Sequence, residues 1–168
     1  MALYFTRKGA DRIQRQLKEF EDKLREVQGT KAHMIDVGGD CWHDNAGFEE
    51  AVRQEHMANG RIGETRRKIA QMKVIDGPPP NTEKLRIGHV AHLLVDGEER
   101  VALIGGYEDS EAETDPPVMS YLAPLVREFI GKEVGDEEAV AVAGGVKTVV
   151  LEKIETPEEH NDNCRRGD

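Results

Sequence analysis

Two stretches of regularly spaced apolar residues dominate the first half of the chain. The first stretch consists of Ile13, Leu17, Phe20, Leu24, Val27 and Met34. The second consists of Phe48, Ala51, Ala58, Ile62, Thr65, Ile69 and Met72. Glu55 is the polar exception within the second stretch. An alternation of three and four residues places such positions on one face of a helix. The pattern therefore predicts two helices, each with one apolar seam.

A short polar segment separates the two predicted helices. The glycine pair at 38–39 should end the first helix, because paired glycines weaken a helix and permit a left-handed turn. Asp44 or Asn45 is a suitable N-cap for the second helix. Helices joined by a short turn bury both seams only if they lie antiparallel. We therefore predict a coiled-coil finger over residues 1–76, roughly 40 Å long at about 1.5 Å per residue, with its tip at residues 38–48. The same periodicity also fits a dimerisation coil or a packing hairpin.

The second half of the chain opens with a proline-rich segment, residues 77–82, which cannot continue a helix and favours a stiff linker. Beyond it, period-two patterns and glycine turns predict several short strands. These strands cover 88–94, 100–104, 139–143 and 146–154. Together with a short helix at 123–130, they give residues 83–155 an α+β fold with a mainly antiparallel sheet. The polar tail, residues 156–168, is expected to be disordered.

Charge is unevenly distributed along the chain. The net charge is −10, with 14 Lys/Arg and 13 Asp/Glu through Asp76, then 9 and 20 in the remainder. Because phosphate neutralisation supplies most of the affinity of duplex-binding domains, this acidity argues against direct binding of duplex DNA. No apolar run reaches the about 20 residues that span a membrane, so we expect no membrane partner and a cytoplasmic location. Cys41 and Cys164 are expected to be reduced thiols.

The predicted tip carries two carboxylates, Asp40 and Asp44. Oxygen ligands suit a hard cation such as Mg²⁺, but two carboxylates form an incomplete cage, so a partner or water would have to complete it. The same residues also fit a purely local role, because Asp often satisfies the backbone of turns and helix caps. Trp42 either packs across the turn or contacts the surface of a partner.

The sequence carries few other signs of chemistry. Cys41 and His43 are candidate zinc ligands, but a closed zinc site needs four ligands with paired spacing, and no second Cys/His pair stands elsewhere in the sequence. There is no phosphate-binding glycine loop and no nucleophile elbow, and the histidines lack a triad-like context. The chain is therefore not expected to be an autonomous enzyme.

Several segments resemble one known family. They are Asp44-Asn45-Ala46 at the tip, Val74-Ile75-Asp76, Ile87-Gly88, Pro124, residues 130–136 and Gly144-Gly145-Val146. Placed around a coiled-coil hairpin, these segments make the chain similar to the Gre transcript-cleavage factors (GreA/GreB type) over nearly its whole length, to about Glu155. The segment 130–136 is the most specific of them.

The resemblance implies a small FKBP-like second domain and RNA polymerase as the partner. Gre factors dock this domain at the rim of the polymerase's secondary channel and extend the finger towards the active centre. There the tip acids help to hold a Mg²⁺ ion shared with the polymerase, near the 3′ end of the nascent RNA. The polymerase then cleaves its own backtracked transcript, so the factor is not itself an enzyme and binds no cofactor alone.

The resemblance also assigns roles to residues of this chain. It implies that Asp40, Asp44 and Asn45 act in cleavage, with Asp40 and Asp44 as ligands of the shared Mg²⁺. The implied polymerase contacts are Trp42, Phe48, Ser120, Pro124, Leu125 and Arg127.

The chain departs from the family pattern at two places. Asp44 stands where the family has Glu, and the family's Asp would fall on Cys41, whereas this chain has Asp40 one residue earlier. Before Pro124, the family's Asn-Ser is replaced by Leu122-Ala123. The main functional prediction is a transcription elongation factor that stimulates transcript cleavage. The alternatives are a channel-occupying regulator or anti-cleavage inhibitor without cleavage activity, and a scaffold coil unrelated to polymerase.

Overall fold

The structure, a computed structural model, describes residues 2–38 and 46–166. The chain divides into two compact units. The helical unit comprises Met1–Ala2 and Ala10–Met72, and the sheet unit comprises Leu3–Gly9 and Lys73–Asp168. The sheet unit therefore takes in a short segment near the N-terminus in addition to the second half of the chain.

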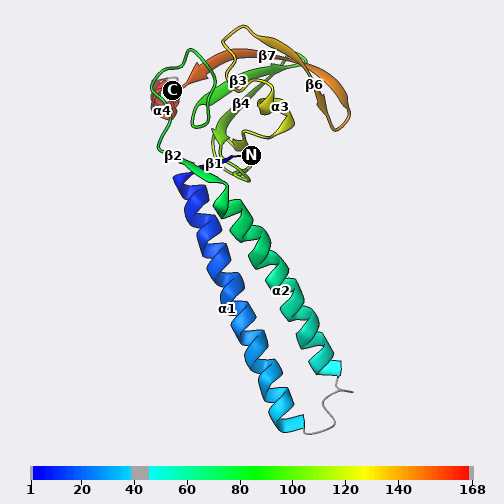
Figure 1. Cartoon of the computed structure of the whole chain (residues 1–168). Helices are drawn as coiled ribbons and strands as arrows, with labels where there is room; N and C mark the ends of the chain where they lie inside the picture. The colour runs from blue at the N-terminus through cyan, green and yellow to red at the C-terminus, as the bar shows by residue number, and fades with distance from the viewer. Residues whose placement is uncertain (1, 39–45, 167–168) are drawn as a thin grey trace. The chain divides into compact units, whose positions relative to one another are not determined.

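The helical unit is a hairpin of two long helices, α1 (Arg7–Gly38) and α2 (Ala46–Ala70). They lie side by side and antiparallel (Figure 1). Every apolar position of the first predicted seam, from Ile13 to Met34, is buried or half-buried. The α2 seam buries Ala51, Ala58, Ile62 and Thr65. The predicted hairpin is confirmed, and α1 ends at Gly38, where the glycine pair predicts its end.

No helix among the described residues is long and apolar enough to cross a membrane.

The sheet unit is built on a five-stranded sheet. Its strands are β3 (Val90–Val95), β4 (Glu98–Gly105), β5 (Val118–Ser120), β6 (Glu137–Val142) and β7 (Gly145–Glu155). In the order β5-β4-β3-β7-β6, neighbours are antiparallel except β4 and β5, which run parallel. The predicted α+β class with a mainly antiparallel sheet is confirmed. The sequence pattern misses β5, because three residues are too few to show a period of two.

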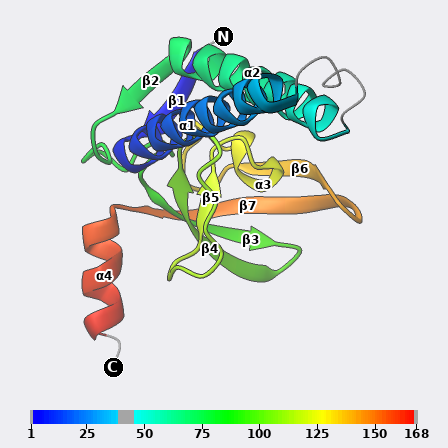
Figure 2. The same cartoon turned by 90° about the horizontal axis from the view of Figure 1, so that it is seen from below.

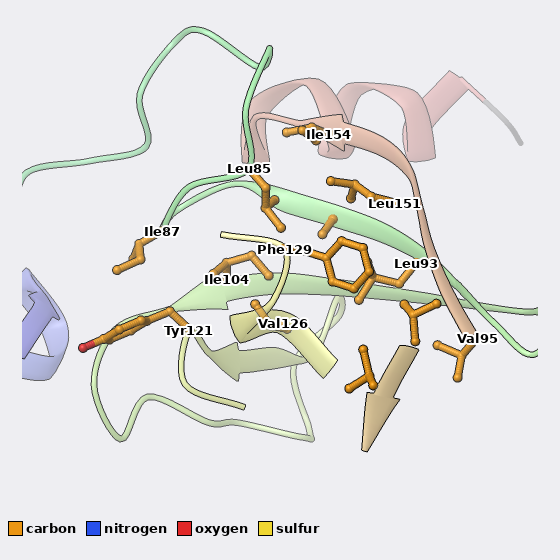
Figure 3. Close-up of a cluster of buried hydrophobic side chains, with 13 residues drawn as sticks. Leu85, Ile87, Leu93, Val95, Ile104, Tyr121, Val126, Phe129, Leu151 and Ile154 are labelled. Carbon is orange, nitrogen blue, oxygen red and sulfur yellow. The ribbon is translucent and has the colours of Figure 1, made fainter. Parts of the chain in front are cut away.

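The apolar core of the sheet unit gathers side chains from the sheet and from the segment around α3 (Pro124–Arg127). Phe129 and Val126 are fully buried, and they contribute to one cluster with Leu93 of β3 and Leu151 of β7. Phe129 lies in the middle of this cluster (Figure 3). Burial of these side chains fixes the position of α3 on the sheet, since burying one large apolar side chain stabilises by about 1.5–3 kcal/mol.

Two further strands, which the sequence pattern does not predict, pair in a separate two-stranded sheet: β1 (Leu3–Thr6) and β2 (Met72–Ile75). Phe5 of β1 is 2% exposed, and the centre of its ring lies 5.4 Å from the centre of the Tyr107 ring. The Thr6 hydroxyl donates to a carboxylate oxygen of Asp109 at 2.6 Å. A Cβ at Gly106 would lie 2.7 Å from the backbone nitrogen of Thr6, so only glycine permits this approach. These contacts anchor β1 in the sheet unit.

Residues 157–166 of the polar tail form a helix, and the prediction of disorder is wrong for them. Figure 2 shows this helix, α4 (Pro157–Arg166), continuing from the end of β7. The Glu159 N–H donates to Thr156 Oγ1 at 3.3 Å, and the Thr156 N–H donates to the Glu159 carboxylate at 2.9 Å. This reciprocal capping box satisfies two backbone donors at the helix start, and Pro157 favours the first helical position. Such a cap needs no apolar seam, which explains why hydrophobic periodicity does not reveal α4.

Candidate functional site

The seam of the helical unit contains one polar cross-link, at the position where the sequence pattern is interrupted. Glu55 of α2 accepts a hydrogen bond from Gln28 Nε2 at 3.0 Å and another from the ammonium group of Lys31, both on α1. The hydrogen bond from Lys31, and then the one from Gln28, lower the pKa of Glu55. Glu55 is therefore a fixed anion that ties the two helices together near their tip ends.

Two more contacts hold the helices together farther from the tip. Arg66 of α2 donates to Glu21 of α1 at 2.7 Å, and the Arg61 guanidinium lies 5.8 Å from the centre of the Phe20 ring. Partners early in α1 thus meet residues late in α2, as an antiparallel pair requires. The hairpin brings Gly38 and Ala46 to the same end of the helical unit, opposite to the end at which the chain enters and leaves.

The predicted tip falls mostly outside the described residues. Asp40, Trp42, Asp44 and Asn45 all belong to residues 39–45, so their assignment stays a prediction. The same holds for Cys41 and His43. Phe48 is described and is half-buried near the start of α2.

The second predicted contact segment surrounds α3. The helix starts with Pro124 at its first turn and has no side-chain cap, and the N–H groups of Val126 and Arg127 donate to the carbonyl of Ala123, both at 2.9 Å. Ser120 is 8% exposed, and its hydroxyl accepts the N–H of Leu122 at 3.4 Å. Ser120 therefore shapes the turn before α3 and offers little surface to a partner.

The exposed side chains of this segment form a mixed apolar and basic surface. Pro124 and Arg127 are exposed and Leu125 is half-buried. Leu122 and Ile130, which flank them, are 41% and 36% exposed. We call Leu122, Pro124, Arg127 and Ile130 the α3 surface. Exposed apolar side chains beside an arginine are typical of protein–protein contacts.

Ile130 also lines a cavity of 640 Å³ in the sheet unit. The proline-rich segment forms one wall, and Leu85, Ile87 and Tyr121 form another. The buried His89 holds the proline segment in place through a hydrogen bond between its Nε2 and the carbonyl of Pro79 at 2.8 Å. Most residues that line the cavity are apolar, and its charged residues are Asp76 and Arg86.

The segment 130–136, which carries the most specific family resemblance, makes structural contacts. The Gly131 N–H donates to the carbonyl of Leu85, and the Gly135 N–H donates to the carbonyl of Leu151, both at 2.8 Å. Both glycines have positive φ, +86° and +95°, a conformation that favours glycine. Lys132 donates to Glu138 at 2.7 Å, which raises the pKa of the lysine. The resemblance in this segment therefore follows from the fold.

The described residues contain one cluster that the sequence does not reveal. His92 of β3, Glu155 at the end of β7 and His160 of α4 offer ligand atoms that all lie within 4.8 Å of one another. His92 and Glu155 are 63 positions apart, and His160 lies in the tail predicted to be disordered. The capping box at Thr156 and the proline at position 157 are local signals that would have placed His160 on a helix.

Comparisons with known proteins place this arrangement in a family. The family described as "Transcription elongation factor, GreA/GreB, C-term" matches residues 80–156. The chain is 27% identical over 152 residues to transcription elongation factor GreA of Nautilia profundicola, covering 89% of this chain and 91% of that protein. It is 32% identical over 115 residues to GreA of Caulobacter sp. (strain K31), covering 67% of this chain and 71% of that protein.

The crystal structure of GreA factor homolog 1 of Thermus thermophilus is 18% identical and covers 92% of this chain and 99% of its own, with a TM-score of 0.43. The family of this chain follows from its sequence relatives. The chain folds as a helical hairpin followed by a mainly antiparallel sheet. The match of residues 80–156 and the identity to the Caulobacter GreA show that this chain belongs to the GreA/GreB family of transcription elongation factors.

Proposed function

We propose that this chain binds RNA polymerase and stimulates Mg²⁺-dependent cleavage of backtracked transcripts by the polymerase. The observation that carries the proposal is the hairpin of the helical unit. Its shorter helix has 25 residues, which corresponds to a rod of about 37 Å at about 1.5 Å per residue. The chain that links the helix ends, residues 39–45, contains both Asp40 and Asp44. Such a rod suits the delivery of two carboxylates into a narrow channel of a partner.

The proposal assigns a separate task to each unit. The sheet unit docks at the rim of the secondary channel through the α3 surface, and the helical unit enters the channel towards the 3′ end of the nascent RNA. Asp40 and Asp44 supply hard oxygen donors of the kind that suits Mg²⁺, and Asn45 adds an amide beside them. Two carboxylates are too few to hold Mg²⁺ alone, so the remaining ligands come from the polymerase and water.

Transcript cleavage in stalled elongation complexes tests the role of the two acids. The full chain should accelerate release of the RNA 3′ fragment, and Asp40→Asn and Asp44→Asn should each remove most of this effect. A loss of about 100-fold is reasonable, because small misplacements of reacting groups have effects of that size. Asp36→Asn is the matched control, since Asp36 is exposed on α1 and the charge change is the same. Equal cleavage with the wild type and with the Asp40→Asn/Asp44→Asn double variant would refute the role of these acids.

The second candidate function is a regulator that occupies the channel without stimulating cleavage. The observation in its favour is the altered tip, where Cys41 stands in place of the family's Asp. The same cleavage assay separates the two functions: a wild-type chain that binds polymerase and leaves cleavage unchanged or slower is the regulator. A chain that does not bind polymerase would contradict both functions.

A competition experiment tests the docking role of the α3 surface. Arg127→Glu in the full chain should weaken competition with the wild type for core RNA polymerase by about 10-fold or more, equivalent to about 1.4 kcal/mol. Arg100→Glu is the matched control, because Arg100 is an exposed arginine of β4 outside the α3 surface. If the two variants compete equally well, docking through the α3 surface is wrong.

A further inference from the structure

Three side chains from three elements of the sheet unit converge on one point. His92 Nε2 lies 2.9 Å from an oxygen of the Glu155 carboxylate, and His160 Nδ1 lies 3.2 Å from the same oxygen. His92 stands on β3, Glu155 ends β7 and His160 is on α4. The three side chains therefore connect α4 to the central strand β3 and to the end of strand β7.

Glu155 is a buried carboxylate, with only 3% of the residue exposed. Burial raises its pKa, but hydrogen bonds from Lys153, His92, His160 and Asn163 outweigh burial and lower the pKa to about 2. Lys153 and Asn163 donate to one oxygen, and the two histidines face the other. Glu155 is therefore an anion at neutral pH, and one of its oxygens is directed at both imidazoles.

The outer nitrogen of each imidazole has its own partner. His92 Nδ1 lies 2.9 Å from an oxygen of Glu99, and an ionised carboxylate accepts hydrogen bonds but cannot donate them. Each ring nitrogen of His92 therefore faces a carboxylate oxygen, Nδ1 that of Glu99 and Nε2 that of Glu155. His160 Nε2 lies 3.7 Å from Cys164 Sγ, which leaves its Nδ1 directed at the same oxygen. The ligand atoms of His92, Glu155 and His160 all lie within 4.8 Å of one another, so a single cation would contact all three.

The backbone at His92 is adapted to this convergence. The pairing of β3 with β7 shifts register between His92 and Leu93, and Glu152 is the extra residue on β7. A β-bulge of this kind re-aims the side chains beside it and is common next to functional sites. Here the bulge lies directly beside His92 on β3 and in the same strand as Glu155.

We propose that His92, Glu155 and His160 form a binding site for a divalent transition-metal ion, with zinc as the best match to the ligands. Two imidazoles and one carboxylate are a ligand set that zinc uses with water in the fourth position. Ligand atoms around tetrahedral zinc lie about 3.4 Å apart, given bonds of about 2.0–2.2 Å. The two separations from the Glu155 oxygen, 2.9 and 3.2 Å, reach this value with small side-chain movements.

Glu99 and Cys164 would not contact the ion themselves. They contact the outer ring nitrogens of His92 and His160. A carboxylate that accepts the outer N–H of a ligating histidine fixes the tautomer and strengthens the ligand, which is the position of Glu99 beside His92. Because His160 belongs to α4 and the other two ligands belong to the sheet, the ion would fasten α4 to β3 and β7. The site is distinct from the tip acids, which use a cation only inside the polymerase.

Metal titration of the full chain tests the site. After treatment with a chelator, the purified protein is titrated with Zn²⁺, and with Co²⁺ as a spectroscopic probe. We expect one ion per chain. Removal of a hydrogen-bond partner of a ligand lowers metal affinity by about 10–100-fold. His160→Ala removes a ligand itself, so it should weaken binding by at least about 100-fold. Glu99→Gln should weaken it by about 10-fold. His56→Ala is the matched control, because His56 is exposed on α2, and it should leave the affinity unchanged.

Two further variants make the outcome decisive. Cys41→Ser/His43→Ala removes the other candidate ligands of zinc, and binding should persist in it. His92→Ala should lose binding as His160→Ala does, and circular dichroism checks that both variants stay folded. Zn²⁺ should also slow amide hydrogen exchange in residues 157–166 of the wild type but not of His160→Ala. The proposal is overturned if Zn²⁺ binds equally well to wild type and His160→Ala, if the tip variant abolishes binding, or if the wild type binds no ion and the histidines serve only as hydrogen-bond donors.

Discussion

The cross-link at Glu55 gives a sharp prediction about the helical unit. Glu55→Ala removes the ion pair to Lys31 and the hydrogen bond from Gln28, and it leaves the Lys31 ammonium group half-buried without this partner. The side chains of Lys31 and Glu55 are 27% and 20% exposed. Exposed ion pairs contribute about 0.2–1 kcal/mol, and hydrogen bonds to charged groups about 1.5–3 kcal/mol. Half-burial places this cross-link between the two ranges, so we expect a loss of about 1–2 kcal/mol in the stability of the helical unit.

The pH dependence of this loss has a definite sign. The pKa of Glu55 in the folded chain lies below its unfolded value of 4.5, because Lys31 and Gln28 donate to the carboxylate. Its contribution is therefore fully present above pH 4.5 and disappears as the pH falls through the lowered folded pKa. The difference between wild type and Glu55→Ala should be constant near neutral pH and shrink in acid.

Amide hydrogen exchange is the suitable assay, because it reports the opening of the helical unit separately from that of the sheet unit. The amides around Gln28 and Glu55 should exchange about 5–30-fold faster in Glu55→Ala, which corresponds to about 1–2 kcal/mol. Glu64→Ala is the matched control, since Glu64 is an exposed glutamate of the same helix. Equal exchange in the two variants, or a difference that persists unchanged in acid, would refute the reasoning.

Three further predictions concern the sheet unit. Phe129→Ala should lower the free energy of unfolding by about 3–5 kcal/mol in urea titrations, because a fully buried aromatic side chain leaves a cavity; a loss below 1 kcal/mol would contradict its central place in the core. Thr156→Ala should speed amide exchange at the start of α4 by about 5-fold, equivalent to a lost cap of about 1 kcal/mol, and unchanged exchange would argue against the capping box. His89→Leu should destabilise the unit by about 1–3 kcal/mol, because the backbone N–H of Arg86 loses a buried acceptor; a urea midpoint equal to that of the wild type would show that Pro79 and Arg86 find other partners.

The hairpin was predictable because its determinants are local and repeated. Ile13, Leu17, Phe20, Leu24 and Val27 are all buried or half-buried, so a three-and-four spacing suffices to identify the seam. Glu55 broke the pattern, and its partners explain why, since Lys31 and Gln28 face it from the other helix. The partners of a polar residue in a seam can be predicted only when the register of the two helices is known.

The parts that sequence reasoning missed depend on contacts between distant residues. β1 and β2 have four residues each, and they pair across the whole helical hairpin. No local period can indicate such a pairing, because strand identity here comes from tertiary contacts. The His92, Glu155 and His160 cluster is missed for the same reason, since its members share no spacing motif and meet only after β3, β7 and α4 have come together.

The anchoring of β1 in the sheet unit affects the order in which parts of the chain can fold during translation. The helices find each other over short distances in sequence, with Lys31 and Glu55 only 24 positions apart, so a nascent chain can close the hairpin before the sheet unit exists. Thr6, by contrast, donates a hydrogen bond to Asp109, 103 positions later. Phe5 can contact Tyr107 only after that residue has been synthesised. The beginning of the chain therefore reaches its final place only after translation has passed β4. A fragment that lacks residues 3–6 would deprive the sheet unit of the buried Phe5 side chain.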